Sequence, residues 1–269
     1  MAADCFEAFN WADRYQVPVV VLADKHLSTS FWTIDELSFE GWKIDRGALT
    51  WPIPGPDTDG RATNGAPNAG HGGTAGYLRY APAEGGVSPR TRPGQEGGVF
   101  WTTSDEHDPR GHITESAANR IEMTRKRMSK LDTAAAEIPV ERKLRLHGPP
   151  EAEFTLVGWG STKGAILDAL AELQARGGPR CNHLQIRLLR PFPAAEVRAA
   201  LGKAKRAILV ENNYTGQLGA LIREQTAVEL PHRLLKYDGR PFSQEEMLEG
   251  LRAVFEKGEA TVAVSHLSA

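Results

Sequence analysis

The stretch Glu153-Phe-Thr-Leu-Val-Gly-Trp-Gly-Ser-Thr-Lys-Gly164 decides the fold of this 269-residue chain. An apolar run ends in a turn with three glycines, and residues 165–173 then repeat apolar side chains at helical spacing. An apolar run, a glycine turn and an amphipathic helix, in this order, predict the opening strand and helix of a parallel α/β unit.

The turn itself is a candidate ligand site, because a helix N-terminus offers free backbone N–H groups to an anion. Its spacing is neither G-x-G-x-x-G nor the P-loop pattern, since Lys163 comes too early. A structural βα turn is favoured over phosphate binding. The candidate ligand or subunit-contact residues in this turn are Gly160, Ser161, Thr162 and Lys163.

The strand–helix pattern continues to the end of the chain and predicts a parallel sheet covered on both faces. Pro149-Pro150 marks the start of this domain, which we place at residues 149–269. The predicted strands are 153–158, 183–188, 206–211 and 232–236, and the predicted helices are 163–176, 194–204, 217–228 and 244–257.

A second candidate site follows the predicted strand 206–211, where Glu211, Asn212, Asn213 and Thr215 precede a helix. Ligands of open α/β sheets bind at the carboxyl ends of the strands. Asn and Thr are equally suited to cap the helix N-terminus. A ligand or interface site and a cap therefore remain open alternatives.

The first 40 residues predict only part of a sheet domain. Phe6, Phe9 and Tyr15 share one helical face, and the apolar run 17–22 predicts a buried strand. One helix and one strand cannot bury their own apolar surface. We therefore expect residues 1–40 to be the end of a larger α/β domain and to depend on a partner.

Residues 41–148 predict a connecting arm rich in Gly and Pro, with mobility expected at 50–73 and a long helix at 115–137. For the basic cluster 125–127, a solvated face of that helix is favoured over a docking patch. Its expected apolar face consists of Ile121, Met128, Leu131 and Ala135.

Carboxylates and imidazoles cluster at 103–115, where the candidates are Glu106, His107, Asp108 and His112. Both are good ligands for zinc or manganese. The stretch has no H-x-x-x-H or H-E-x-x-H spacing. Hydrogen bonds within a tight loop, or a subunit contact, are therefore favoured over a metal site.

The overall composition excludes several classes of protein. The 32 basic and 34 acidic residues are balanced, so we expect no binding to nucleic acid or to an anionic membrane. The run 17–23 is too short to span a membrane, and from the first residues we expect no secretory leader. Two cysteines without a C-x-x-C pair predict a cytoplasmic, reduced protein, and they cannot hold an all-cysteine iron–sulfur cluster, which needs four.

Five stretches resemble, in order, the alpha subunit of 2-oxoacid:ferredoxin oxidoreductases. They are residues 15–27, 86–90 with Pro93-Gly94, 104–114, 158–164 and 211–218. The resemblance implies the end of a thiamine-enzyme pyrimidine-type domain followed by a transketolase C-terminal-like α/β domain.

In this family, thiamine diphosphate adds to a 2-oxoacid, carbon dioxide leaves, an iron–sulfur cluster takes the electrons to ferredoxin, and coenzyme A accepts the acyl group. The resemblance places the magnesium–diphosphate site and the [4Fe-4S] cluster in the beta subunit. The catalytic elements of the alpha subunit precede the residues matched here. We therefore expect no catalytic residue and no cofactor held by this chain alone.

The expected partners are the beta subunit, ferredoxin through the complex and, where it is encoded separately, the upstream alpha or gamma portion. Two other hypotheses stay open at this point. One is a noncatalytic interaction module or the remnant of a split gene, and the other is a small phosphate- or nucleotide-binding protein that uses Ser161, Thr162 and Lys163.

Overall fold

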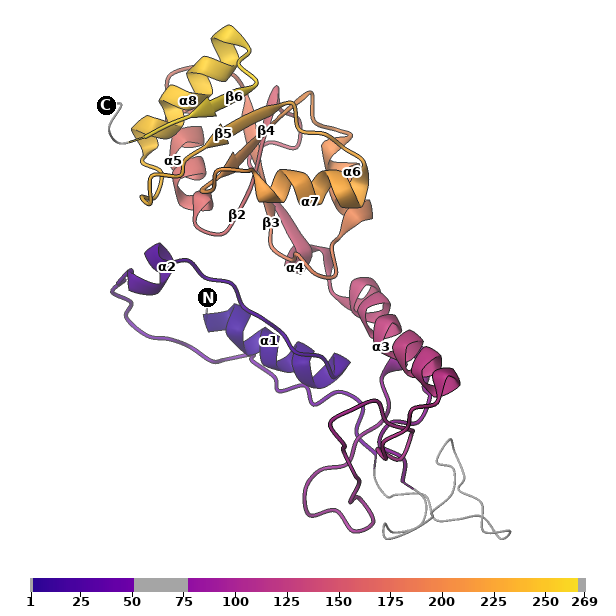
Figure 1. Ribbon diagram of the computed structural model, residues 1–269. Coiled ribbons are helices and arrows are strands. Elements are labelled where there is room, and N and C mark those ends of the chain that lie inside the picture. The colour runs from indigo at the N-terminus through magenta and orange to yellow at the C-terminus, as the bar shows by residue number, and fades with distance from the viewer. Residues whose placement is uncertain (1, 51–76, 266–269) are drawn as a thin grey trace. The chain divides into compact units, whose positions relative to one another are not determined.

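The computed structural model describes residues 2–50 and 77–265 (Figure 1). The chain divides into two units, one of Met1–Val21 with Glu36–Glu137, the other of Leu22–Asp35 with Ile138–Ala269. The mobility expected at residues 50–73 concerns positions 51–73, which lie outside the described residues.

The second unit contains a six-stranded sheet in the order β1-β3-β2-β4-β5-β6. β2, β3, β4, β5 and β6 run parallel, and β1 pairs antiparallel with β3 at one edge. The strands are β1 (Leu144–His147), β2 (Phe154–Trp159), β3 (Cys181–Ile186), β4 (Arg206–Glu211), β5 (His232–Leu235) and β6 (Thr261–Ala263).

Helices cover both faces of this sheet (Figure 1). α5 (Thr162–Ala175) and α8 (Gln244–Lys257) pack on one face, and α6 (Ala194–Leu201) and α7 (Gln217–Thr226) on the other. α8 approaches closely at Gly250, where a Cβ would lie 2.2 Å from Leu234 Cδ1. The two remaining helices of this unit are α2 (Lys25–Thr29) and α4 (Val140–Lys143).

Two apolar layers form the core. Leu156, Ile208 and Leu234, each 0% exposed, face α5 and α8, while Val157 and Leu209 face α6 and α7. Alternate residues of buried parallel strands point to opposite faces, so a continuous apolar run satisfies both layers. The predicted parallel α/β sheet is confirmed, and the four predicted strands and four predicted helices are all present.

The first unit is organised by α3 (Ala117–Glu137), which α1 (Ala2–Tyr15) and the short helix η1 (Glu84–Gly86) contact. Arg14 of α1 donates to Glu137 Oε2 at 3.0 Å and to Asp45 Oδ2 at 3.0 Å. Thr133 of α3 donates to the carbonyl of Gly85 at 2.9 Å, which fixes η1 on the long helix.

The predicted helix 115–137 is present, but its predicted apolar face is only partly right, since Leu131 and Ala135 are partly buried and the other two residues are not. Ile121 and Met128 are 52% and 49% exposed, whereas Met123 and Ala134 are buried. The packed face lies against η1 and against the loop that contains Tyr80. The partly buried Lys126 and Lys130 complete this face. Because long lysine side chains can bury their methylene stems, a count of apolar residues misplaces this face.

The basic cluster 125–127 is also not simply solvated. Lys126 Nζ donates to the Tyr80 carbonyl at 2.9 Å, and burial lowers the pKa of Lys126 to about 8. Arg127 donates to both carboxylate oxygens of Glu106. Two of the three basic side chains therefore hold loops to α3, Lys126 the loop with Tyr80 and Arg127 the loop with Glu106.

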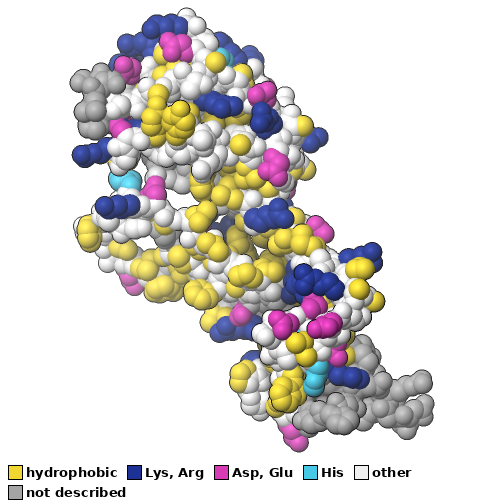
Figure 2. Space-filling model, viewed as in Figure 1, with side chains coloured by type: hydrophobic (Ala, Val, Ile, Leu, Met, Phe, Trp, Pro, Cys, Tyr) yellow, Lys and Arg dark blue, Asp and Glu magenta, His cyan; other side chains and the backbone are white. Residues whose placement is uncertain are grey.

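The strand predicted at residues 17–22 is wrong. These residues have no strand assignment, and Val20 and Leu22 are 77% and 62% exposed. An extended segment becomes a strand only when a neighbour satisfies its backbone groups, and none of the described residues pairs with it. Figure 2 shows hydrophobic side chains gathered on the visible face of this part of the chain.

Candidate functional site

The carboxyl ends of the parallel strands carry a hydrogen-bonded centre at Glu211, the last residue of β4. Its side chain is fully buried and accepts from Trp159 Nε1 at 3.1 Å and from the Leu218 amide at 2.8 Å. A buried carboxylate is tolerated only when its oxygens accept hydrogen bonds. Glu211 thus ties the end of β2 to the start of α7.

Asn213 completes this arrangement. Its Nδ2 donates to Glu211 Oε1 at 2.9 Å, and its Oδ1 accepts from the amides of Gly216 at 2.7 Å and Gln217 at 3.2 Å. Glu211 and Asn213 therefore occupy three amides at the N-terminus of α7. Asn212 donates to the Arg240 carbonyl at 3.3 Å, and exposed Thr215 precedes the helix.

The turn at 160–163 lies at the neighbouring strand end. Thr162 is buried, and its hydroxyl donates to the Trp159 carbonyl at 2.9 Å. Gly160 has a φ of 60°, in the left-handed region that favours glycine. Ser161 is the N-cap of α5 without a side-chain capping bond. Gly160, Ser161 and Thr162 thus form the βα turn, and Lys163 lies in the first turn of α5.

Other residues at this edge belong to the loops that follow the predicted strands but were not among the candidate site residues. The rings of Tyr214 and Tyr237 meet edge to face at 5.0 Å, with 72% and 53% of each residue exposed. Buried Lys236 pairs with Glu246 and, at 3.3 Å, with Asp238. Both tyrosines come within three residues of a predicted strand end, and that position is the signal that would have identified them.

A pair of stacked histidines lies on β1 and β3, with ring centroids 5.6 Å apart. His183 is fully buried, and its Nδ1 lies 2.9 Å from the carbonyl of Leu156. Burial lowers the pKa of His183 to about 4, so the ring is neutral near pH 7. The sequence analysis did not single out either histidine.

In the first unit, the loop of Glu106, His107, Asp108 and His112 closes on itself. The Asp108 amide donates to the His112 carbonyl at 2.8 Å, and Asp108 Oδ1 accepts from the His112 amide at 3.1 Å. His107 lies against Tyr80, and His112 against Trp101, with centroid distances of 4.3 and 5.8 Å. The two imidazoles thus contact different aromatic rings.

Glu106 fastens this loop to α3. Arg127 donates to its two oxygens at 2.9 and 2.8 Å, and Arg120 lies 3.1 Å from Oε2. The two-pronged bond from Arg127 lowers the pKa of Glu106 to about 2. The loop has the hydrogen bonds of a structural element, in keeping with the favoured interpretation of its sequence.

The cysteines of this chain and the donor side chains of its described residues do not fit the metal groups that its resemblance implies. A [4Fe-4S] cluster takes four thiolates, but the sequence has two cysteines, and burial raises the pKa of the Cys181 thiol to about 12. Within residues 2–50 and 77–265, no group of three or more His, Cys, Asp or Glu side chains is placed to hold a metal ion. No helix in those ranges is long and apolar enough to cross a membrane.

The sheet domain matches a known class. The family model of the pyruvate:ferredoxin oxidoreductase core domain II matches residues 152–247, from β2 into α8. The second unit therefore contains an oxidoreductase core domain of this type.

Full-length comparisons extend the match. The chain is 36% identical to the 2-oxoacid:ferredoxin oxidoreductase subunit alpha of Saccharolobus solfataricus, over 96% of this chain and 38% of that protein. It is also 36% identical to the 2-oxoacid:ferredoxin oxidoreductase 2, subunit alpha, of Aeropyrum pernix, over 98% of this chain and 38% of that protein. The chain is thus similar to 2-oxoacid:ferredoxin oxidoreductase alpha subunits along nearly all of its own length, and it spans less than two fifths of the length of these relatives.

A solved structure supports the fold. The chain is similar to a 2-oxoglutarate:ferredoxin oxidoreductase from Magnetococcus marinus, solved with 2-oxoglutarate, coenzyme A and succinyl-CoA bound. The TM-score is 0.71 with 28% identity, over 90% of this chain and 38% of that chain. This likeness confirms the mixed α/β fold class, and the family match favours an oxidoreductase subunit over a free-standing interaction module or a phosphate-binding protein.

Proposed function

We propose that this chain supplies the C-terminal portion of an alpha subunit to a thiamine diphosphate-dependent 2-oxoacid:ferredoxin oxidoreductase. The complex would convert a 2-oxoacid, coenzyme A and oxidised ferredoxin to acyl-CoA, carbon dioxide and reduced ferredoxin. The supporting observation is the identity to alpha subunits along 96–98% of this chain.

The proposed contribution of this chain is structural. The complex would use thiamine diphosphate, magnesium and a [4Fe-4S] cluster held elsewhere; in support, the chain has two cysteines where such a cluster takes four. The proposed partners are the beta subunit, the remaining alpha or gamma portion and, through the complex, ferredoxin. The proposed location is the cytoplasm, in keeping with the two unpaired cysteines.

Two surfaces are proposed to make the subunit contacts. One is the strand-end edge with Lys163, Asn212 and Thr215, where the exposed pair Tyr214 and Tyr237 adds the aromatic surface that interfaces favour. The buried members of that edge, Glu211 and Thr162, would hold its shape. The other is the loop with His107 and His112, which Glu106 and Asp108 fix in place.

The test is reconstitution with the companion polypeptides that resemble the rest of an alpha subunit and a beta subunit. The assay is 2-oxoacid-dependent reduction of an artificial electron acceptor, with thiamine diphosphate, magnesium and coenzyme A. We expect activity only when this chain and its companions are combined. Cofactor-dependent decarboxylation by this chain alone would refute the structural role, and a reconstituted complex that is equally active without it would refute membership in the complex.

The contact edge has its own test. Replacing both Tyr214 and Tyr237 by Ser should weaken copurification with the companions. Truncating a central aromatic residue commonly costs an interface about 2 kcal/mol or more of binding free energy. Replacing Met128 of α3, which is 49% exposed and lies outside both proposed surfaces, by Ser is the control for loss of an exposed apolar side chain. Unchanged assembly of the tyrosine variant would exclude this edge as an interface.

A further inference from the structure

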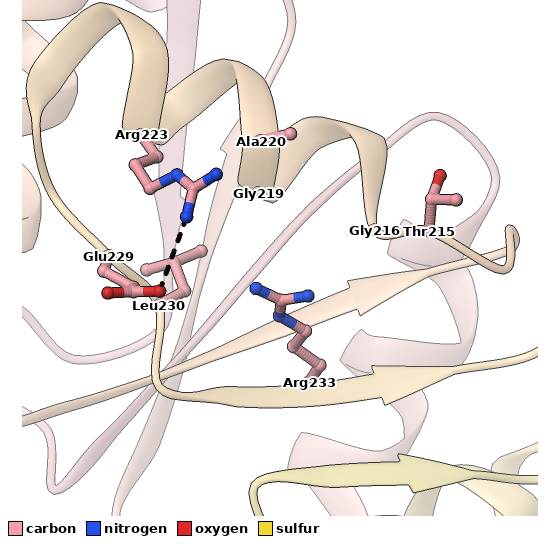
Figure 3. Close-up of a pocket in the computed structure, with 8 residues that line it drawn as sticks. All are labelled: Thr215, Gly216, Gly219, Ala220, Arg223, Glu229, Leu230 and Arg233. Atoms are coloured by element: carbon pink, nitrogen blue, oxygen red, sulfur yellow. Dashed lines mark ion pairs between the residues drawn. The ribbon is translucent and has the colours of Figure 1, made fainter.

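A small pocket of about 130 Å³ lies between α7 and β5 (Figure 3). Its helix side is formed by Gly216, Gly219 and Ala220, which lie at the start of α7 and carry no bulky side chains. Gly219 is required by packing, because a Cβ there would lie 2.7 Å from Leu209 Cδ2. The small residues therefore let α7 approach the sheet closely, and because they lack large side chains they leave an open space beside the helix.

Two arginines from different elements enter this space. Arg233 comes from β5 and Arg223 from the last turn of α7, and Figure 3 shows both guanidinium groups turned towards the pocket. Arg233 is half-buried, and among the described residues no side chain accepts a hydrogen bond from it or pairs with it. A half-buried guanidinium without a carboxylate partner is unusual, because desolvation of a charge is unfavourable and buried charges are paired in most proteins.

The single acid of the pocket is only loosely engaged. Glu229 lies 3.8 Å from Arg223, and the two side chains are 67% and 63% exposed. Exposed pairs at this distance contribute little to stability. The pocket thus brings together two positive charges and one weakly paired negative charge.

The N-terminus of α7 does not account for this site. The amides of Gly216, Gln217 and Leu218 already donate to Asn213 and Glu211, so the helix end is capped from within the chain. Any anion in the pocket would be held by the arginines.

We propose that this pocket binds a phosphate group, free or at the end of a small molecule, between Arg223 and Arg233. Each guanidinium offers a planar fork of N–H donors that matches a pair of phosphate oxygens. Two forks from different directions suit a tetrahedral oxyanion, whereas a planar carboxylate has oxygens for one fork. The site is separate from the candidate residues 160–163, and the proposal does not rest on the proposed function.

The test is titration of the whole chain with inorganic phosphate at low ionic strength, followed by calorimetry or by NMR of the Arg233 and Gly219 amides. We expect saturable binding. Arg233→Gln should weaken it by about tenfold or more, because charge-assisted hydrogen bonds are lost. Glu229→Gln should strengthen it, because the competing carboxylate is removed.

The matched control is Arg252→Gln on α8, since Arg252 and Glu256 form a similarly exposed pair at 3.9 Å. This variant should bind phosphate as the unaltered chain does. A thermal melt of each variant checks folding, and Arg223→Gln replaces Arg233→Gln if the strand variant unfolds.

Three results would overturn the proposal. They are the absence of saturable binding, equal weakening by Arg252→Gln, and no gain from Glu229→Gln. Acetate that binds as tightly as phosphate would overturn the choice of phosphate, and sulfate that competes with phosphate would support an oxyanion held by charge and shape.

Discussion

Two apolar runs of this chain have opposite surroundings. Residues 154–159 form a central strand whose Leu156 and Val157 are 0% exposed, whereas the run 17–22 lies unpaired with Val20 77% exposed. Nearby, Phe31 and Trp32 are 100% and 90% exposed. The comparison teaches that an apolar run predicts burial, but a strand forms only where the same chain supplies paired neighbours.

The exposed run has a physical consequence for the whole protein. Large apolar side chains gathered on a surface favour association, and an unpaired extended backbone offers hydrogen bonds to another strand. We expect the companion portion of the alpha subunit, or the beta subunit, to cover residues 17–34. The chain's match to less than two fifths of its relatives is in keeping with that expectation.

Hydrogen exchange would separate the two runs by the largest effect. Amides of residues 19–22 should exchange nearly as fast as in an unfolded chain, whereas those of β2 should be protected by about 5 kcal/mol or more. The measurement is exchange monitored by mass spectrometry or NMR on the isolated chain. Strong protection of residues 19–22 in a verified monomer would mean that the chain completes its own first domain.

Truncating a core residue should have the next largest effect. Leu251→Ala should lower the free energy of unfolding by about 3–4 kcal/mol, because Leu251 is 0% exposed and the loss leaves a cavity. Trp32→Ala, which removes a larger but exposed side chain, should change it by less than about 0.5 kcal/mol. Urea denaturation of both variants checks the pair, and similar losses would contradict the exposed position of Trp32.

The pH dependence of stability should reflect His183. Its pKa is lowered to about 4 in the folded chain, so the unfolded chain binds the proton more readily. Stability is therefore full above the ordinary histidine pKa near 6.5 and decreases as the pH falls towards 4, by at most about 3 kcal/mol.

Thermal melts from pH 7 to pH 4.5 check this prediction. His183→Asn retains a donor for the Leu156 carbonyl but does not titrate, so its melting temperature should fall less over this interval. A parallel decrease in both proteins would assign the pH dependence to other groups.

The smallest effect is expected at the start of α8. Ser243 accepts from the Glu246 amide at 3.2 Å while Glu246 accepts from the Ser243 amide at 2.8 Å, which is a capping box. Ser243→Ala should cost about 1 kcal/mol. Ser161→Ala is the control, because Ser161 caps α5 without a side-chain bond and should cost less. Equal costs in urea denaturation would show that the observed bond does not stabilise the helix.

The regular part of the fold was predictable because its signals are local. Continuous apolar runs and glycine turns identify β2, β4 and α5, and buried parallel strands require such runs. The edge strands β1 and β6 were missed because they are short and half-exposed, with Arg145 and Thr261 pointing to solvent. No local pattern distinguishes such strands from loops.

The site residues were predictable by position rather than by role. Strand ends led to Glu211 and Asn213, and capping by an asparagine was one of the two alternatives. The structure shows Asn213 accepting from α7 amides and adds Glu211, whose capping bond was not expected. Arg223 and Arg233 line the same pocket because α7 lies beside β5, and their spacing of ten residues in the sequence gives no sign of this. The lysines of α3 were misjudged because hydropathy assigns a long charged side chain to solvent, even where its stem packs.

The two short edges of the sheet limit how this domain can aggregate. β1 has four residues and β6 has three, so each edge presents few backbone groups to another chain. Short edge strands are one of the ways in which natural sheets resist continuation into a neighbouring molecule. At high concentration in the cell, this domain should therefore not aggregate by adding strands to the edges of its sheet. Any specific association must depend on side chains rather than on the sheet backbone.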